Sequence, residues 1–457
     1  MTIRAITGLV ALNVGFAVMG ASFLWAVRGF ARWSDALRLG GLGYLLGVAA
    51  FGTVWTQFLV LGLPFGGWGV ILTLVGGTVA ACLVGVRLGR SRPRGFAGLG
   101  PTSTASLLVT ASGVALVGLL LEAFFRSARL QSLQAFDAWA FWVPKAKAIY
   151  FFGGLDEQVF TTSAGPTYPP LVPIVDAAAF HAMGSADTVT FHLQFWFLVT
   201  GAVVAIAGCL YRHAPAWALW PSILLVLVVP RFGERLMTPQ ADVLVDVLFV
   251  LGALLLALSL RDWRGWRLAA VAVLFAGATL TKREGLLYVG LALVVAFAAS
   301  WSRKRVAWPA LASVAAVVIA AAVPWRLWYR SHDIAGEAPP SLGAGAAFER
   351  ALDSLRLSWN VLFDTSLWSV VPFVLVIALA IGLAWGDRRL AAFFAVLTIL
   401  VFFGGAWVTY SYRDLPITEN EALNPIVRYT GAIVVLAAAA MPLLVASAWT
   451  GNRERET

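Results

Sequence analysis

One polar stretch of this sequence combines the residue types that a group transfer from a phosphate carrier needs. The segment 136–147 reads FDAWAFWVPKAK and holds Asp137, Lys145 and Lys147. A carboxylate can accept the proton of a hydroxyl as its oxygen attacks, and lysines can neutralise a phosphate leaving group. We therefore predict Asp137 as a catalytic base and both lysines as phosphate ligands. Asp137 could instead cap the following helix, and the lysines could extend toward lipid head groups.

Further candidates for phosphate binding lie in the second half of the chain. Lys282 and Arg283 follow an apolar segment at the end where other cations are scarce, and a bound phosphate would account for both. Glu284 offers a local ion-pair partner, which is the alternative explanation. Arg428 and Tyr429 open the last apolar segment from the same side, so we include them among the predicted phosphate ligands.

Acidic residues in the same half of the chain could hold a divalent cation. Asp242 and Asp246 are four residues apart and therefore lie on one face of a helix. With Glu234 and Asp137 they could form an oxygen-rich site suited to Mg²⁺ or Mn²⁺. Asp242 could equally well cap the helix that it opens.

Aromatic residues and a histidine could contact a sugar or an acceptor. Trp139, Trp142 and Tyr168 are placed to stack on a sugar ring, although tryptophan and tyrosine also form belts at membrane surfaces. His181 has no zinc-ligand spacing to another histidine or cysteine. We therefore interpret it as structural or as part of the acceptor side.

The rest of the chain consists mainly of apolar segments that must position these side chains. Of the 457 residues, 60% are hydrophobic and 12% charged, and the mean hydropathy is +0.84. These values exclude a soluble domain and predict an all-α polytopic membrane protein with about 13 transmembrane helices, since about 20 apolar residues cross a bilayer. The predicted spans are 5–27, 39–63, 68–87, 104–125, 190–211, 216–231, 239–260, 266–281, 285–301, 308–329, 366–385, 389–411 and 426–449.

The charges alternate along these spans as the positive-inside rule requires. Arginine and lysine clusters follow the odd-numbered spans, from 28–38 to 453–455, which predicts an external N-terminus and a cytoplasmic C-terminus in the plasma membrane. This pattern accounts for the net charge of +10, so no nucleic-acid partner is expected. The large loop 126–189 is then external. Its segments 138–151 and 171–183 are too short to span and are predicted to lie along the membrane surface.

Four features between residues 104 and 330 resemble, in their order and spacing, the GT-C superfamily of integral membrane glycosyltransferases. They are Asp137 just outside an apolar segment, YPPL at 168–171, ADVL at 241–244 and TKREG at 281–285. The superfamily includes protein O-mannosyltransferases, oligosaccharyltransferases and lipid A aminoarabinose transferases. Its members take a sugar from a polyprenyl-phosphate or polyprenyl-diphosphate carrier.

The resemblance implies a GT-C-like fold with three parts. Accessory helices at 1–103 would precede a catalytic core at 104–330, whose large outer loop carries interfacial helices and the catalytic carboxylate. An outer loop and C-terminal helices would follow at 331–457. The chain departs from the family pattern where paired acids are expected, because Ala138 follows Asp137. Dependence on Mg²⁺ or Mn²⁺ therefore stays open.

The expected activity is that of an inverting hexosyl- or pentosyltransferase at the outer face of the membrane. Its expected partners are a polyprenyl-phosphate-linked sugar, a glycan, lipid or protein acceptor with a free hydroxyl, and membrane lipid. Two alternatives stay open. A lipid-linked glycan polymerase or ligase would place its large loop late in the chain, and a secondary transporter or flippase would place ionisable residues near mid-membrane.

Overall fold

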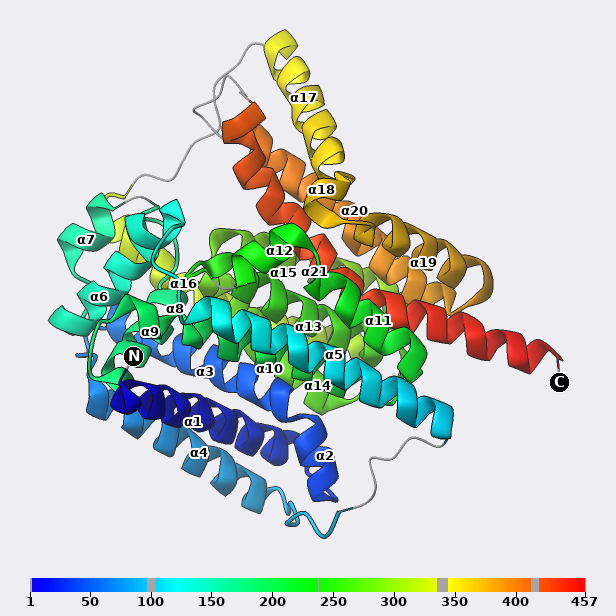
Figure 1. Cartoon of the computed structure of the whole chain (residues 1–457), viewed down its shortest axis with the longest axis horizontal. Helices are drawn as coiled ribbons and strands as arrows, with labels where there is room; N and C mark the ends of the chain where they lie inside the picture. The colour runs from blue at the N-terminus through cyan, green and yellow to red at the C-terminus, as the bar shows by residue number, and fades with distance from the viewer. Residues whose placement is uncertain are drawn as a thin grey trace.

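The computed structural model describes residues 2–96, 103–163, 165–236, 238–334, 344–411 and 419–456. Throughout these ranges the chain folds into helices and no strand occurs. Figure 1 shows the helices packed side by side into a bundle, with the two termini at opposite sides of the view. The prediction of an all-α protein is confirmed.

Among the described residues, nine helices are long and apolar enough to cross a membrane. They are α1 (Ile3–Arg28), α3 (Gly40–Val60), α4 (Gly67–Arg87), α5 (Thr104–Ala128), α9 (Thr188–Phe191) continued by α10 (Leu193–Leu210), α13 (Ala241–Arg261), α16 (Lys304–Ser331), α20 (Arg388–Ser411) and α21 (Glu419–Glu456). The other four predicted spans correspond to shorter helices. These are α11 (Ala216–Leu227), α14 (Gly265–Thr281), α15 (Arg283–Ala299) and α19 (Val371–Trp385). The helices suggest a multi-pass membrane protein, while the larger span count and the GT-C fold stay predictions.

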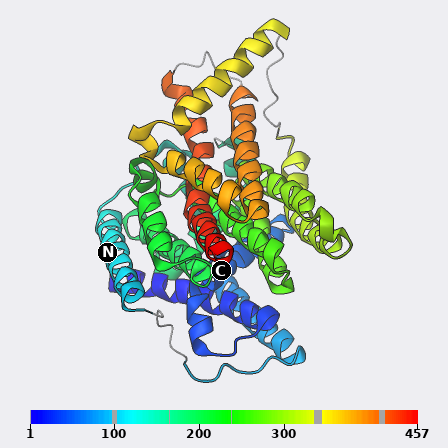
Figure 2. The same cartoon turned by 90° about the vertical axis from the view of Figure 1, so that its right-hand side faces the viewer.

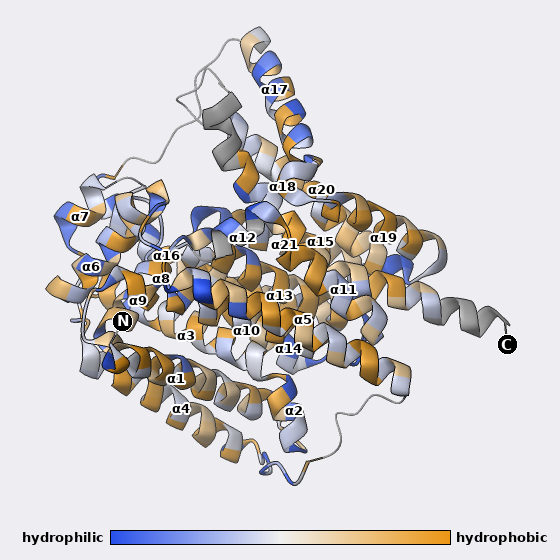
Figure 3. Ribbon diagram, in the orientation of Figure 1, coloured by the Kyte–Doolittle hydropathy of each residue, from blue (hydrophilic) through white to orange (hydrophobic). Residues whose placement is uncertain are grey.

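Burial separates central helices from peripheral ones. The apolar windows of α13 and of Ile426–Trp449 in α21 are 94% buried, whereas those of α4 and α5 are 11% buried. A helix that is apolar on all faces belongs in an interior, and α21 lies in the middle of the bundle in Figure 2. The helices α4 and α5 carry many exposed apolar side chains, which suit contact with lipid tails. Much of the ribbon of both helices is orange, that is hydrophobic, in Figure 3.

A buried polar triad ties the N-terminal helices to the middle of the chain. Tyr44 of α3 donates a hydrogen bond to Asn13 Oδ1 at 2.7 Å, and Asn13 of α1 donates to Gln194 Oε1 of α10 at 2.8 Å. Buried polar groups cost free energy unless they are paired. The triad therefore selects one register of α1 and α3 against α10.

The large loop folds into short helices at one end of the bundle. They are the π-helix η1 (Ala138–Trp142), α6 (Val143–Phe152), α7 (Glu157–Thr162) and α8 (Leu171–Met183). Nearly every residue of α8 is buried, and α8 packs against α1, α3 and α6. Protein thus covers both faces of this apolar helix, while its position along the membrane surface stays a prediction.

The adjacent helices α13 and α14 carry a group of charged residues at each end of the helix pair. Asp242 lies in the first turn of α13, and Lys282 directly follows the last residue of α14. Arg261 ends α13, and Arg264 precedes α14. The 17 residues of α14 span about 25 Å. The Asp242 and Arg264 ends of this helix pair are thus about 25 Å apart, somewhat less than the roughly 30 Å of a bilayer's hydrocarbon core.

The C-terminal helices pack around α21. Both α19 and α20 contact it, and the amphipathic helix α17 (Ala344–Leu362) projects from the body in Figure 1. The remaining short elements are α2 (Trp33–Arg38), α12 (Pro230–Leu236), η2 (Trp301–Arg303) and α18 (Thr365–Trp368). Parts of the predicted outer loops 330–365 and 411–425, namely 335–343 and 412–418, lie outside the described residues.

The predicted sidedness can be tested by cysteine accessibility. Gln158 on α7 and Arg92 after α4 are both exposed. In a variant lacking Cys82 and Cys209, we expect a membrane-impermeant maleimide added outside intact cells to label Gln158→Cys but not Arg92→Cys. Disrupting the membrane should expose both. Labelling of both cysteines in intact cells would contradict the topology.

Candidate functional site

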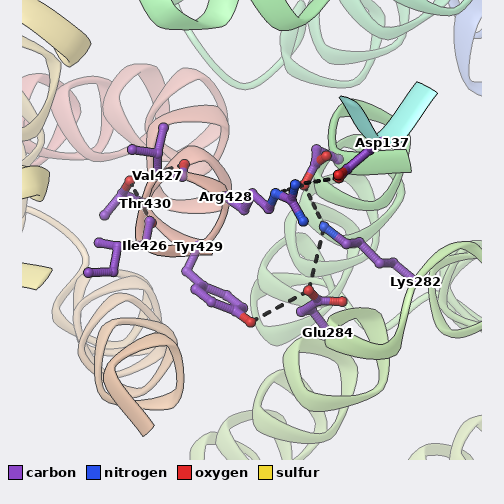
Figure 4. Close-up of polar contacts among 9 residues, drawn as sticks. Asp137, Lys282, Glu284, Ile426, Val427, Arg428, Tyr429 and Thr430 are labelled. Atoms are coloured by element: carbon purple, nitrogen blue, oxygen red, sulfur yellow. Dashed lines mark hydrogen bonds and ion pairs between the residues drawn. The ribbon is translucent and has the colours of Figure 1, made fainter. Parts of the chain in front are cut away.

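Charged side chains from distant parts of the chain form one network, which we call the Asp137 cluster (Figure 4). Its members are Asp137, Asp242, Lys282, Glu284 and Arg428. Arg428 Nη2 donates a hydrogen bond to Asp137 Oδ2, and its Nε lies 3.9 Å from Asp242 Oδ1. Lys282 Nζ lies 2.6 Å from Asp242 Oδ1 and 3.4 Å from Glu284 Oε1. Three carboxylates thus share two cations.

Helix ends place Asp242, Lys282 and Glu284, whereas Arg428 projects from within α21. Asp242 and Glu284 lie in the first turns of α13 and α15, where the helix dipole favours a negative charge. Lys282 has φ −156° and ψ 155°, so one extended residue separates α14 from α15. This break turns the lysine toward the two acids. Lys282 is 1% exposed, which makes it a pairing group inside the protein.

The structure distinguishes between the two interpretations of Asp137 and of Asp242. Asp137 precedes η1 but makes no side-chain capping hydrogen bond, and its carboxylate binds Arg428 instead. The N-cap of α13 is Gln240, one residue before the helix, and Asp242 binds Lys282. Capping is therefore the wrong explanation for Asp137 and for Asp242, and both acids belong to the ion-pair network.

Tyr168, from the YPPL turn, forms the aromatic side of this network. The Arg283 guanidinium lies 4.9 Å from its ring centroid and Lys282 Nζ lies 5.9 Å from it, within the range of cation–π attraction. The Tyr168 ring also stacks with the rings of Phe141 and Trp142, with 5.5 Å between ring centroids in each pair. The aromatic stack thus joins the large loop to the two neighbouring cations.

The last helix contributes a second contact to the cluster. Tyr429 donates a hydrogen bond to Glu284 Oε1 at 3.5 Å (Figure 4). Asp246 lies one turn beyond Asp242 and is buried. A Cβ atom on Gly431 would come within 3.2 Å of Asp246 Oδ2. The absence of a side chain at Gly431 therefore permits the close approach of α21 to α13 beneath the cluster.

The two lysines of the large loop have different environments. Lys145 is fully buried, donates a hydrogen bond to the Gly165 carbonyl at 2.8 Å, and lies near the rings of Phe141 and Phe160. Lys147 is half-buried on the same helix. Side chains two residues apart point roughly 200° apart around a helix. The predicted pair therefore cannot bind one phosphate together.

Burial lowers the pKa of Lys145 from 10.5 to about 7. Between pH 7 and pH 10.5 the Lys145 amine is protonated in the unfolded chain but neutral in the folded protein. The free energy of unfolding therefore rises with pH in this range. We expect a contribution of up to about 1.4 kcal/mol per pH unit from pH 7 upward. Unfolding of Lys145→Met, followed from pH 6 to 9, should lack this rise, whereas Lys147→Met should retain it. An unchanged slope in Lys145→Met would contradict the assignment.

Other predicted sugar or acceptor contacts lie in separate environments. Trp139 is exposed and packs edge-on against Phe136, so it is available at the surface. Trp142 is buried beneath Tyr168. His181 lies about 15 Å along α8 from its start and packs against the ring of Tyr150 at 4.6 Å. The structure thus does not bring His181 to the Asp137 cluster.

The predicted cation site is not formed. Glu234 is exposed and pairs with Arg231 at 2.7 Å, while Asp137 and Asp242 face arginine and lysine. In the described part of the chain, no three histidine, cysteine, aspartate or glutamate side chains are grouped so that they could hold a metal ion. The carboxylates that the sequence suggested for Mg²⁺ or Mn²⁺ are instead paired with arginine and lysine side chains of the protein.

The sequence identified the members of the cluster and Glu284 as a local ion-pair partner, which the contact with Lys282 confirms, but it missed the pairs between distant residues. Asp137 and Arg428 are 291 residues apart, and no local pattern links them. The sequence indicated only that both residues lie on the same predicted side of the membrane. Phe141, which stacks on Tyr168, was not singled out, although it lies inside the FDAWAFW run. Comparisons with protein-family models, curated proteins and solved structures found no match to this chain.

Proposed function

We propose that this protein is a membrane glycosyltransferase that moves a sugar from a polyprenyl-phosphate donor to an acceptor hydroxyl. The observation that supports this most directly is the Asp137 cluster, which combines a carboxylate with cations beside the large loop. Ion pairs buried in a membrane protein are costly and are usually functional. The cluster also lies at one end of α13 and α14, where a lipid phosphate at the membrane surface could reach it.

Arg428 has two roles in this proposal. In the donor-free protein it binds Asp137 and holds the carboxylate in position. A donor phosphate would compete with Asp137 for the guanidinium, because arginine binds phosphate and carboxylate with the same planar fork. Donor binding would then release the carboxylate to accept a proton. The base would thus be activated only when the donor is present.

The reaction would proceed by direct displacement. The acceptor oxygen forms a bond to the anomeric carbon as its proton passes to Asp137 Oδ2. The bond between that carbon and the phosphate oxygen breaks, and polyprenyl phosphate leaves with its negative charge near Arg283 and Arg428. One displacement inverts the configuration of the sugar. Lys282 would position Asp242 and Glu284, since it is buried between them.

The position of the ion pairs favours an enzyme over a transporter. A transporter would place its ionisable groups near mid-membrane, at interrupted helices. The Asp137 cluster instead lies at the end of α13 and at the junction of α14 with α15. The large loop also comes early in the chain and contributes Asp137 and Tyr168 directly, which favours a glycosyltransferase over a polymerase or ligase.

A donor-binding experiment tests the proposal. In nanodiscs, we would measure binding of polyprenyl-phosphate hexoses and pentoses, and acceptor-dependent release of polyprenyl phosphate. We expect Arg283→Ala to weaken donor binding about 10- to 150-fold, the equivalent of one charge-assisted hydrogen bond. Arg356→Ala, an exposed arginine on α17, is the matched control. Failure of the wild-type protein to bind any lipid-linked sugar would contradict the proposed function.

A further inference from the structure

A second group of charges lines a cavity at the end of α13 and α14 opposite the Asp137 cluster. The cavity has a volume of about 640 Å³ and is formed by the ends of α1, α4, α10, α13 and α14 together with α2. We call it the arginine cavity after six of its lining residues, which are Arg28, Arg38, Arg90, Arg212, Arg264 and Arg267. Asp35 and Asp262 also line it. Six arginines against two carboxylates leave four positive charges in excess.

A single carboxylate oxygen serves three of these arginines. Asp35 Oδ1 lies 3.1 Å from Arg212 Nη2, 3.5 Å from Arg38 Nη2 and 3.9 Å from Arg28 Nη2. One negative charge cannot balance three guanidinium groups, so two charges remain uncompensated at this point. Arg38 Nε is moreover buried without a hydrogen-bond partner. Such groups are costly away from water unless an anion pairs with them.

Structural roles account for only some of the arginines in the arginine cavity. Arg90 donates hydrogen bonds to the carbonyls of Ala26 and Val27 at the end of α1. Arg267 donates to the carbonyls of Leu258 and Asp262 at the end of α13. These two side chains satisfy carbonyl groups that a helix end leaves without partners. Arg38 likewise donates to the Gly208 carbonyl at the end of α10, and Arg28 donates to the Gly29 carbonyl. These bonds supply no negative charge, so three guanidinium groups still share the one carboxylate of Asp35.

The walls of the cavity hold the arginines in place and keep the potential positive. The Trp266 ring lies 5.6 Å from the guanidinium carbon of Arg28 and, likewise, of Arg267. His213, at the turn after α10, has its pKa lowered to about 4 by burial first and then by nearby arginines. The imidazole is therefore neutral at physiological pH. The cavity is thus preorganised for an anion without help from histidine.

From this geometry we propose that the arginine cavity binds a phosphate or diphosphate group. Arginine forks match phosphate oxygens in pairs, and the volume falls within the usual range of small-ligand sites, about 300–1,000 Å³. The group could belong to the head of an anionic lipid or to a soluble phosphate compound, since both present the same chemistry. This site is separated from the Asp137 cluster by the length of α14 and does not depend on the proposed transfer reaction.

The test uses two probes with the full-length protein. Sodium diphosphate would be titrated calorimetrically into the protein in a neutral detergent. In parallel, native mass spectrometry would record phosphatidic acid retained from phosphatidylcholine nanodiscs that contain it. Arg212 is 60% exposed, so Arg212→Gln and Arg212→Glu should fold normally. We expect Arg212→Gln to weaken binding of the effective probe about 10- to 100-fold, and Arg356→Gln on α17 to leave it unchanged.

The outcomes separate the two sources of the ligand. Diphosphate binding that depends on Arg212 supports a soluble phosphate compound, and Arg212-dependent retention of phosphatidic acid alone supports a lipid head group. The proposal is overturned if neither probe binds the wild-type protein more tightly than Arg212→Glu. It is equally overturned if Arg356→Gln weakens binding as much as Arg212→Gln, because binding would then reflect net charge alone.

Discussion

Replacing Asp137 by asparagine is expected to lower the rate of sugar transfer about 100- to 10,000-fold while the donor remains bound. The amide has nearly the size of the carboxylate and can still accept a hydrogen bond from Arg428, so the local packing should persist. It cannot take the proton of the acceptor hydroxyl. Turnover should be measured as polyprenyl phosphate released, beside direct measurement of donor binding to the same preparation.

A matched control comes from the same loop. Glu157 is an exposed acid on α7, and Glu157→Gln should leave both turnover and donor binding close to wild type. Because Arg428 Nε also lies near Asp242, Asp137→Asn leaves the arginine with a second carboxylate, and the variant should fold. Near-wild-type transfer by Asp137→Asn would rule out this residue as the base.

Replacing Lys282 by methionine is expected to lower the free energy of unfolding by about 3–5 kcal/mol, which is the usual cost of removing one partner of a buried ion pair. Methionine keeps the length of the side chain but leaves Asp242 and Glu284 without their shared cation. Thermal or denaturant unfolding in a defined detergent would measure the loss. The exposed Lys304 at the start of α16 supplies the control, and Lys304→Met should change stability by less than about 0.5 kcal/mol.

A double substitution identifies the cause of that loss. Asp242→Asn removes the charge that Lys282→Met leaves unpaired, so the double variant should be more stable than the sum of the two single effects predicts. Coupling energies of residues in direct contact are typically about 0.5–3 kcal/mol. Strict additivity would mean that the 2.6 Å contact between Lys282 and Asp242 contributes little. Lys282 would then be free to act mainly on a bound phosphate.

The sequence by itself determined where the helices lie, since helix formation by an apolar segment long enough to span a membrane is a local property. Apolar stretches long enough to span, such as 239–260 and 426–449, correspond to α13 and α21. Inside hydrocarbon the backbone must satisfy its own hydrogen bonds, and a continuous helix does so within one segment. The order of charges also grouped the arginines of separate loops, and the structure does gather Arg28, Arg212 and Arg264 at one cavity.

Only the tertiary structure decided which side chains meet and which are enclosed. Hydropathy predicted α8 to be apolar but could not indicate that α1, α3 and α6 surround it. Composition placed Lys145 and Lys147 together, whereas packing buried the first and left the second half-exposed. The pairing of Asp137 with Arg428 depends on how α21 approaches the large loop. Such contacts arise from the shape and burial of whole helices, which are properties of the packed chain and not of any local stretch of residues.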